Sequence, residues 1–270
     1  MTAALTPEQL LAQHDAGAPW PAALPSPAFD DVAEAYRSAL TVRRLRQTRG
    51  EQPRGFKIGF TNRQIWERYR VYAPIWGTVW NTTLTMTNGT GRIALQHTCE
   101  PRIEPELVFG LKHTPPSGAD LQALFEALDW LAPGVEIVQS HRPGWRFASA
   151  AETVADGGLH ARLLVGQPLP VARLGADAAA LQQALARASL QLSKGGTPVE
   201  QGVGANVLDD PLQALLHFLN ELRACPGAPD LQAGDVVTTG TWTDAWPVAP
   251  GEHWRVSYSD GLGALDVAFD

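Results

Sequence analysis

From about residue 55 to the C-terminus, the sequence is a succession of short strand-like segments separated by Gly, Pro and Asn. Helical segments are interspersed irregularly, at residues 118–131 and 210–222, so the pattern lacks the strand–helix–strand rhythm of a parallel sheet. A Gly195-Gly196 pair between two such segments indicates a hairpin. We therefore expect an α+β fold whose main part, residues 54–270, is a mixed and largely antiparallel β-rich domain.

Residues 1–53 are expected to form an N-terminal helical region and connector. Thr6 stands at an N-cap position, Pro7 at the first helical position and Gln9 at the capping-box position. A proline-rich stretch, residues 18–29, follows as a stiff connector. A second helix is predicted over residues 30–49.

The basic run "TVRRLRQTR", residues 41–49, is the one cluster of positive charge in a chain whose formal net charge is −7. Proteins that bind the nucleic-acid backbone normally present a basic stripe, so we expect no nucleic-acid partner. We interpret the run as the solvated face of a helix, and a phosphate or membrane patch is the alternative.

Cys99 and Cys225 are the only two cysteines and have neither metal-site nor disulfide-framework spacing. The N-terminus has no basic region followed by an apolar stretch, and no window reaches the length of a membrane span. We expect a cytoplasmic protein in a reducing compartment, without a membrane partner.

Two acidic residues stand two positions apart in the strand-like stretch "RIEPELVF", residues 102–109. In a strand, Glu104 and Glu106 point to the same face, where their charges repel each other unless water, a proton or a cation intervenes. One interpretation is a half-buried strand with its polar side in water. The other is a face that holds something positive.

Glu136 favours the second interpretation, in which this face holds a positive charge. It lies in "APGVEIVQS", between Val135 and Ile137, where burying a lone carboxylate is costly unless it is paired or binds a cation. Three carboxylates without a Cys or His among them suit a hard cation such as Mg²⁺. The alternative, that Glu136 also faces water, stays open at this point.

Lys57 lies in "GFKIGF", with a glycine two positions away on each side. It is either an exposed strand lysine or a lysine brought close to a substrate. In the second case we expect burial to lower its pKa so that it can transfer protons.

Six segments occur in the order seen in the fumarylacetoacetate hydrolase superfamily, and they cover residues from about 54 to the C-terminus. They include "KIGFTNRQIWERY", "EPRIEPELVFG", "APGVEIVQS", "ETVADGG" and "GVGANVLDDPLQALLHFLNEL". The sixth begins with "LQAGDVVTTGTW". The chain most resembles the 2-keto-4-pentenoate hydratase and 4-oxalocrotonate decarboxylase branch of that superfamily.

This resemblance implies a β-roll catalytic domain, a Mg²⁺ or Mn²⁺ ion, a homo-oligomer and a small 2-oxo acid as substrate. It assigns the metal to Glu104, Glu106 and Glu136, and catalytic roles to Lys57 and Asp156. It also implies that a loop holds the substrate carboxylate, with the residues Thr239, Gly240 and Thr241.

The sequence departs from the hydratase pattern in one place, because Asn81 and Thr82 stand where those enzymes carry an acidic pair. We expect a metal-dependent lyase acting on a 2-oxo or 2-hydroxy-dienoic acid, with hydration of a 2-hydroxypenta-2,4-dienoate ahead of decarboxylation of 4-oxalocrotonate or oxaloacetate. Hydrolysis of an acylpyruvate needs a His-activated water, and the absence of His between His14 and His97 counts against it. A non-catalytic binding protein of the same fold is the remaining alternative.

Overall fold

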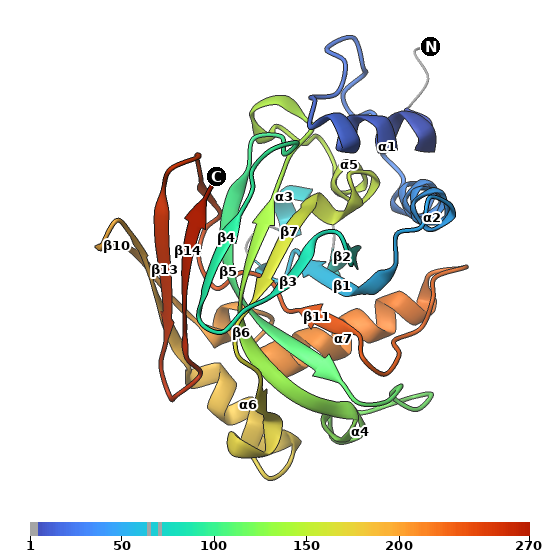
Figure 1. Cartoon of the computed structure of the whole chain (residues 1–270). Helices are drawn as coiled ribbons and strands as arrows, with labels where there is room; N and C mark the ends of the chain where they lie inside the picture. The colour runs from blue at the N-terminus through green and yellow to red at the C-terminus, as the bar shows by residue number, and fades with distance from the viewer. Residues whose placement is uncertain (1–4, 64–65, 70–71) are drawn as a thin grey trace.

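The computed structural model describes residues 5–63, 66–69 and 72–270 (Figure 1). As expected, the N-terminal part is helical. Helix α1 (Pro7–Ala16) begins at a complete Thr6–Gln9 capping box, and helix α2 (Val32–Thr48) begins after an Asp31 cap. Strand β1 begins at Pro53. The division into two domains at residue 53 stays a prediction.

A large sheet forms the centre of the molecule and curls around its own inner face (Figure 1). Its strands run in the order β2-β1-β11-β5-β6-β7-β3, with β12 and β8 paired at the side. Their bounds are β1 (Pro53–Gly59), β2 (Ile75–Trp80), β3 (Leu84–Met86), β5 (Arg102–Leu111), β6 (Leu128–Val138), β7 (His160–Val165), β8 (Leu169–Pro170), β11 (Val236–Thr238) and β12 (Trp246–Pro247).

A second sheet lies on one side of the first (Figure 1). Its strands are β10 (Thr197–Val203), β9 (Ser189–Lys194), β13 (His253–Tyr258), β14 (Ala264–Phe269) and β4 (Thr90–Ile93), in this order. The predicted hairpin is confirmed, since β9 and β10 pair in antiparallel fashion across the Gly195-Gly196 turn. Three of the strand pairs are parallel, β1 with β11, β3 with β7 and β4 with β14, and the others are antiparallel. The expectation of a mixed, largely antiparallel fold is therefore confirmed.

The two faces of the large sheet differ in what covers them. On the outer face, Phe56 of β1 packs against Phe218 of helix α7 (Pro211–Ala224), with ring centroids 5.4 Å apart. On the inner face lies a compact apolar cluster of small side chains: Val79, Val108, Ala132, Leu163, Val165 and Val236. Because Val108 is two and four residues from Glu106 and Glu104 on β5, the two glutamates share this inner face with the cluster.

One predicted helix is shorter than the sequence pattern indicates. Helix α4 covers Leu121–Ala127, and residues 128–131, which the apolar pattern placed in the same helix, begin strand β6. Leu128 pairs with Leu111 and Leu131 with Phe109 on β5. Pairing with a long buried neighbouring strand outweighs the local helix preference here.

The remaining helices lie around the large sheet. They are α3 (Trp66–Tyr69), α5 (Ala150–Ala155) and α6 (Ala178–Arg187), with short 3-10 turns that include Gly157–Leu159. No helix in the described part of the chain combines the length and the apolar character needed to cross a bilayer.

Candidate metal centre and active site

Strands β5 and β6 bring the three predicted metal ligands onto one surface. They pair in antiparallel fashion, with Glu104 directly opposite Glu136 and Glu106 opposite Gly134. Residues directly opposite each other in such a pair project to the same face, and so do residues two apart on one strand. Glu104, Glu106 and Glu136 therefore all point into the inside of the curled sheet.

These three carboxylates converge. One oxygen from each residue can be chosen so that all three lie within 4.8 Å of one another. Glu106 and Glu136 are fully buried, and Glu104 is half-buried at the edge of the cluster. The interpretation that this strand face lies in water is therefore wrong for Glu106 and Glu136.

Two carboxylate oxygens of the cluster have no hydrogen-bond partner among the described residues. Glu106 accepts a bond on Oε2 from the Gly240 backbone N–H, at 2.6 Å, and its Oε1 has no partner. Glu136 accepts a bond on Oε1 from His160 Nδ1, at 2.8 Å, and its Oε2 has no hydrogen-bond partner. Buried polar atoms are normally satisfied, so unpartnered carboxylate oxygens in a three-carboxylate cluster fit a hard divalent cation.

Without a cation, the cluster holds protons more tightly than free glutamate does. Burial raises the pKa of Glu104 to about 7, and the charge of nearby Glu106 adds to this. Burial likewise raises the pKa of Glu136 to about 7, and the pKa of Glu106 lies well above its ordinary value for the same reason. A bound divalent cation would stabilise the ionised form of all three.

Lys57 forms an ion pair with the cluster. Strand β1 directs its side chain to the inner face, where Nζ donates to the carbonyl oxygen of Gly158 at 2.9 Å and lies 3.3 Å from Glu136 Oε2. The side chain is 3% exposed, so Lys57 is not a surface lysine.

The expectation that burial lowers the pKa of Lys57 is wrong for the metal-free protein. Burial does act in that direction, but the charges of Glu136, Glu104 and Glu106 outweigh it and raise the pKa. The upward effect depends on negative charge that a divalent cation would compensate.

Asp156 does not belong to the acidic cluster. Its carboxylate is fully buried and accepts bonds from the backbone N–H of His141 at 3.0 Å and from His141 Nδ1 at 2.6 Å. His14 of helix α1 approaches it from the other side, with Nε2 3.2 Å from Oδ1. Asp156 precedes the Gly157–Leu159 turn, whose Gly158 carbonyl holds Lys57, so its link to the cluster runs through the backbone.

Of the three predicted substrate-binding residues, one touches the cluster. Gly240 has a φ of 94°, and a side chain there would collide with Thr61 Oγ1 at 2.0 Å, so this backbone N–H reaches Glu106 because the residue is glycine. Thr239 donates its hydroxyl to the Leu107 carbonyl and Thr241 donates its hydroxyl to the Thr243 carbonyl. Their role in holding a substrate carboxylate stays a prediction.

His160 supports Glu136, although no motif in the sequence points to it. When Glu136 is ionised its carboxylate can only accept, so His160 Nδ1 then carries the proton and Nε2 accepts from the hydroxyl of Thr83 at 2.8 Å. Burial holds the pKa of His160 well below its ordinary value, which keeps the ring neutral. A register shift between Ile137 and Val138 places His160 beside Glu136, and no sequence pattern signals this shift.

Asn81 and Thr82, which replace the acidic pair of the hydratases, lie outside the acidic cluster. Both are exposed. Asn81 Oδ1 accepts from the backbone N–H of Gln52, and Thr82 donates its hydroxyl to Glu51 at 2.7 Å. Their hydrogen bonds connect the turn after β2 to the residues that precede β1.

Comparison with known proteins finds no matching family model. Among curated proteins, the chain is 29% identical over 239 residues to the 2-hydroxyhexa-2,4-dienoate hydratase of Comamonas testosteroni, covering 88% of this chain and 86% of the relative. It is 30% identical over 247 residues to a 4-oxalocrotonate decarboxylase of a Pseudomonas species, covering 88% of both chains.

Solved structures agree with these relatives. The chain is similar over its whole length to the 4-oxalocrotonate decarboxylase of Pseudomonas putida G7 complexed with magnesium and adipate, with a TM-score of 0.85, 26% identity and complete coverage of both chains. The fumarylpyruvate hydrolase of Pseudomonas aeruginosa shares the fold, with a TM-score of 0.56 and 17% identity over 80% of this chain and 88% of that one. The expected mixed β-roll with helices is therefore confirmed.

Proposed function

Since this chain belongs to the family of 2-keto-4-pentenoate hydratases and 4-oxalocrotonate decarboxylases, we propose that it is a metal-dependent lyase. This family lies within the fumarylacetoacetate hydrolase superfamily, and the proposed substrate is a 2-oxo or 2-hydroxy-dienoic acid. The observation that carries the proposal is the cluster of Glu104, Glu106 and Glu136. In it Glu106 Oε1 has no hydrogen-bond partner among the described residues, and Glu136 Oε2 has only the ion pair with Lys57. We propose hydration of a 2-hydroxypenta-2,4-dienoate as the reaction.

Glu104, Glu106 and Glu136 would hold a Mg²⁺ or Mn²⁺ ion, as their all-oxygen donor set suits both. When bound, the cation supplies Lewis-acid stabilisation of the negative charge that develops on the 2-oxo oxygen. The Gly240 N–H and His160 Nδ1 each occupy one oxygen of a carboxylate, which fixes the orientation of Glu106 and Glu136.

Lys57 is the proposed proton carrier. The Gly158 carbonyl holds Nζ in place, and the inner face of the sheet shields the amine from solvent. From this position Nζ would give a proton to a substrate carbon or take one from it, as a general acid or base must do. Asp156 contributes by holding the turn that carries the Gly158 carbonyl.

Decarboxylation of a 4-oxalocrotonate-type acid is the second candidate. The same charge stabilisation at the 2-oxo oxygen serves loss of CO₂ as well as addition of water. Asn81 and Thr82 favour this candidate because they replace the acidic pair of the hydratases and have no contact with the acidic cluster. Oxaloacetate decarboxylation, acylpyruvate hydrolysis and a non-catalytic binding role follow in that order.

Product analysis separates these candidates. The protein is incubated with 2-hydroxypenta-2,4-dienoate, 4-oxalocrotonate, oxaloacetate or an acylpyruvate, each with Mg²⁺ and with excess EDTA. The proposal predicts Mg²⁺-dependent formation of the hydrated 2-oxo acid. Release of CO₂ would favour the decarboxylase, and cleavage into two acids would favour the hydrolase. No turnover of any substrate would favour the binding protein.

Assembly and compartment are further proposals. We propose a homo-oligomer in the cytoplasm, with a 2-oxo acid as its small-molecule partner and no nucleic-acid or membrane partner. Cys99 and Cys225 are both free thiols, in accord with a reducing compartment. Light scattering on the purified protein measures the number of subunits, and a monomeric mass would refute the oligomer.

A further inference from the structure

The basic run on α2 does not form a purely solvated face, contrary to the sequence expectation. Arg43 and Arg46 turn toward the body of the protein, and both guanidinium groups lie over the ring of Trp80, at 5.7 and 4.5 Å from its centroid. Arg44 and Arg49 of the same run are exposed. The inward-turned Arg46 borders a polar pocket that none of Glu104, Glu106, Glu136 and Lys57 lines.

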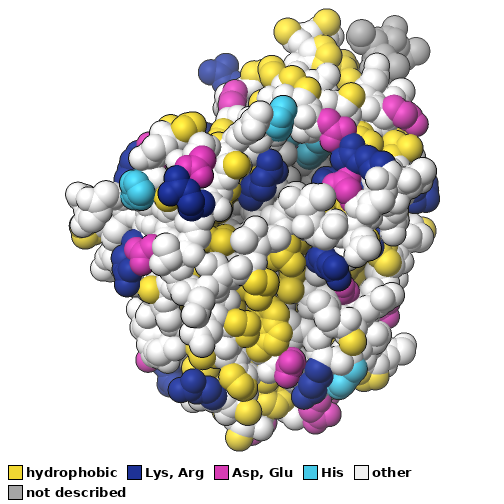
Figure 2. Space-filling model, viewed as in Figure 1, with side chains coloured by type: hydrophobic (Ala, Val, Ile, Leu, Met, Phe, Trp, Pro, Cys, Tyr) yellow, Lys and Arg dark blue, Asp and Glu magenta, His cyan; other side chains and the backbone are white. Residues whose placement is uncertain are grey.

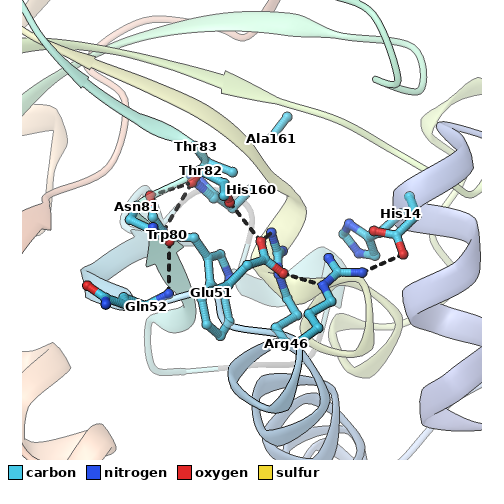
Figure 3. A network of polar contacts seen from close by, with 12 residues as sticks. His14, Arg46, Glu51, Gln52, Trp80, Asn81, Thr82, Thr83, His160 and Ala161 are labelled. Atoms are coloured by element: carbon cyan, nitrogen blue, oxygen red, sulfur yellow. Dashed lines mark hydrogen bonds and ion pairs between the residues drawn. The ribbon is translucent and has the colours of Figure 1, made fainter.

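This pocket lies between α1, the C-terminal end of α2, the turn after β2 and the start of β7 (Figure 3). On the face shown in Figure 2, basic, acidic and histidine side chains gather next to α1 and α2. Most of the titratable side chains that line the pocket are basic residues or histidines: His14, Arg46, Arg49, His97, His160 and Arg162. The two carboxylates that line it are Asp15 and Glu51.

Both carboxylates already form ion pairs with arginines. Glu51 accepts two bonds from Arg46, at 2.6 and 3.1 Å, and one from Arg49. Asp15 accepts one from Arg49 at 2.6 Å. Burial acts to raise the pKa of Glu51, but the hydrogen bonds from Arg46, Thr82 and Arg49 outweigh it and hold this pKa at about 2. The Glu51 carboxylate therefore stays ionised and paired.

Arg162 is the guanidinium left without an acidic partner. It donates to the carbonyl oxygens of Ala161 and Gln96, at 2.8 and 3.1 Å, and forms no ion pair within the described residues. An Arg side chain has five N–H donors and remains charged in proteins. Burial and the charge of nearby Arg46 both lower the pKa of Arg162. Arg46 is paired with Glu51, so Arg162 is the positive charge at this pocket that no carboxylate of the described residues compensates.

We propose that this pocket binds a small oxyanion, a carboxylate or inorganic phosphate, through Arg162, next to the Arg46–Glu51 pair. Guanidinium groups match both kinds of anion because their paired N–H groups meet two oxygens at once. The site is distinct from the metal cluster, since the ring of His160 stands between them, with Nδ1 on Glu136 and Nε2 on Thr83 of the pocket wall. Binding therefore requires neither the divalent cation nor the lyase substrate.

Calorimetric titration of the full chain with inorganic phosphate and, separately, with acetate tests the proposal. Both titrations are run in EDTA at constant ionic strength set with NaCl. We expect saturable binding of at least one anion, and the tighter of the two identifies the ligand class. Arg162→Gln is expected to weaken binding by at least about 10-fold, because one charge-assisted bidentate contact is lost.

Arg92→Gln serves as the matched control, because Arg92 is an exposed arginine on β4 that pairs with Asp270, away from the pocket. It is expected to bind like the wild type. Should Arg162→Gln not fold, Arg162→Lys keeps the charge and is expected to bind more weakly than the wild type because the fork of donors is lost. Absence of saturable binding to the wild type, or wild-type affinity in the folded Arg162 variant, overturns the proposal. Neither result bears on the lyase, which is assayed with Mg²⁺ and without these anions.

Discussion

At the scale of single residues, Glu106 is the most informative ligand to change. Glu106→Gln keeps the size of the side chain and removes a carboxylate, one oxygen of which has no hydrogen-bond partner among the described residues. We expect Mg²⁺-dependent turnover to fall by at least about 100-fold, since changes even outside the direct ligands cost up to that much. The fold is expected to remain intact because burial already favours an uncharged side chain there.

Steady-state kinetics and thermal unfolding of this variant check the expectation. Glu126→Gln is the control, because Glu126 is an exposed glutamate on α4. Unchanged Mg²⁺-dependent turnover in Glu106→Gln would rule out the proposed metal site.

Lys57 separates proton transfer from metal binding. Lys57→Ala removes the Nζ group that lies 3.3 Å from Glu136 and leaves the three carboxylates in place. We expect the variant to bind Mg²⁺ but no longer to catalyse entry of solvent deuterium into a 2-oxo acid. Proton NMR in D₂O measures this exchange, and exchange at the wild-type rate would show that Lys57 carries no proton in the reaction.

At the scale of elements, Asp156 joins helix α1 to the catalytic sheet. Its buried carboxylate contacts His14 of α1 and His141, which follows β6, and these histidines hold its pKa at about 2 although burial acts in the opposite direction. Asp156→Asn removes the charge that both contacts use. We expect the free energy of unfolding to fall by about 2 kcal/mol, because buried hydrogen bonds to a charged group are lost.

Urea denaturation at pH 7 measures this loss, with Asp129→Asn, an exposed position, as the control. Since the folded pKa of Asp156 is depressed, its contribution is present above the unfolded pKa of about 3.9 and disappears as the pH falls toward 2. A loss below about 0.5 kcal/mol at pH 7 would show that Asp156 does not hold α1 in place.

Elements with strong local signals could be predicted from the sequence. The Thr6–Gln9 capping box and the Asp210-Pro211 start of α7 are local hydrogen-bonding patterns, and both helices begin where expected. The alternation around Glu104 and Glu106 placed both on one face, as found. The apolar pattern of residues 128–131 predicts a helix, and this is wrong because pairing with β5, which is distant in sequence, determines their conformation.

The site itself could be predicted in part. Glu136 was recognised because a carboxylate in an apolar strand needs a partner, and the structure places it opposite Glu104. The support from His160 and the upward shift of the Lys57 pKa could not be predicted. Both depend on the distance between strands that the sequence separates, and in the case of His160 on a register shift.

At the scale of the whole molecule, metal binding is expected to couple to stability and to pH. Glu104 and Glu136 have a pKa of about 7 in the metal-free fold, so they must lose protons before they can bind a cation. Because an acid whose pKa is raised by folding destabilises the fold once it ionises, the metal-free protein loses stability from this pair as the pH rises from about 4.5 to 7.

The stabilisation by Mg²⁺ should therefore grow between pH 6 and pH 8. Thermal unfolding in saturating Mg²⁺ and in EDTA, compared at each pH, measures the difference. An equal effect of Mg²⁺ at pH 6 and pH 8 would contradict the assignment of raised pKa values to these ligands.

The proposed metal site consists of three carboxylates from two neighbouring strands around one divalent cation. Anomalous diffraction from a crystal soaked with Mn²⁺ and oxalate, which imitates the chelating end of a 2-oxo acid, locates the cation. We expect one strong peak in contact with an oxygen each of Glu104, Glu106 and Glu136, with oxalate completing the coordination. A peak elsewhere, or any of the three side chains directed away from it, would rule out this site.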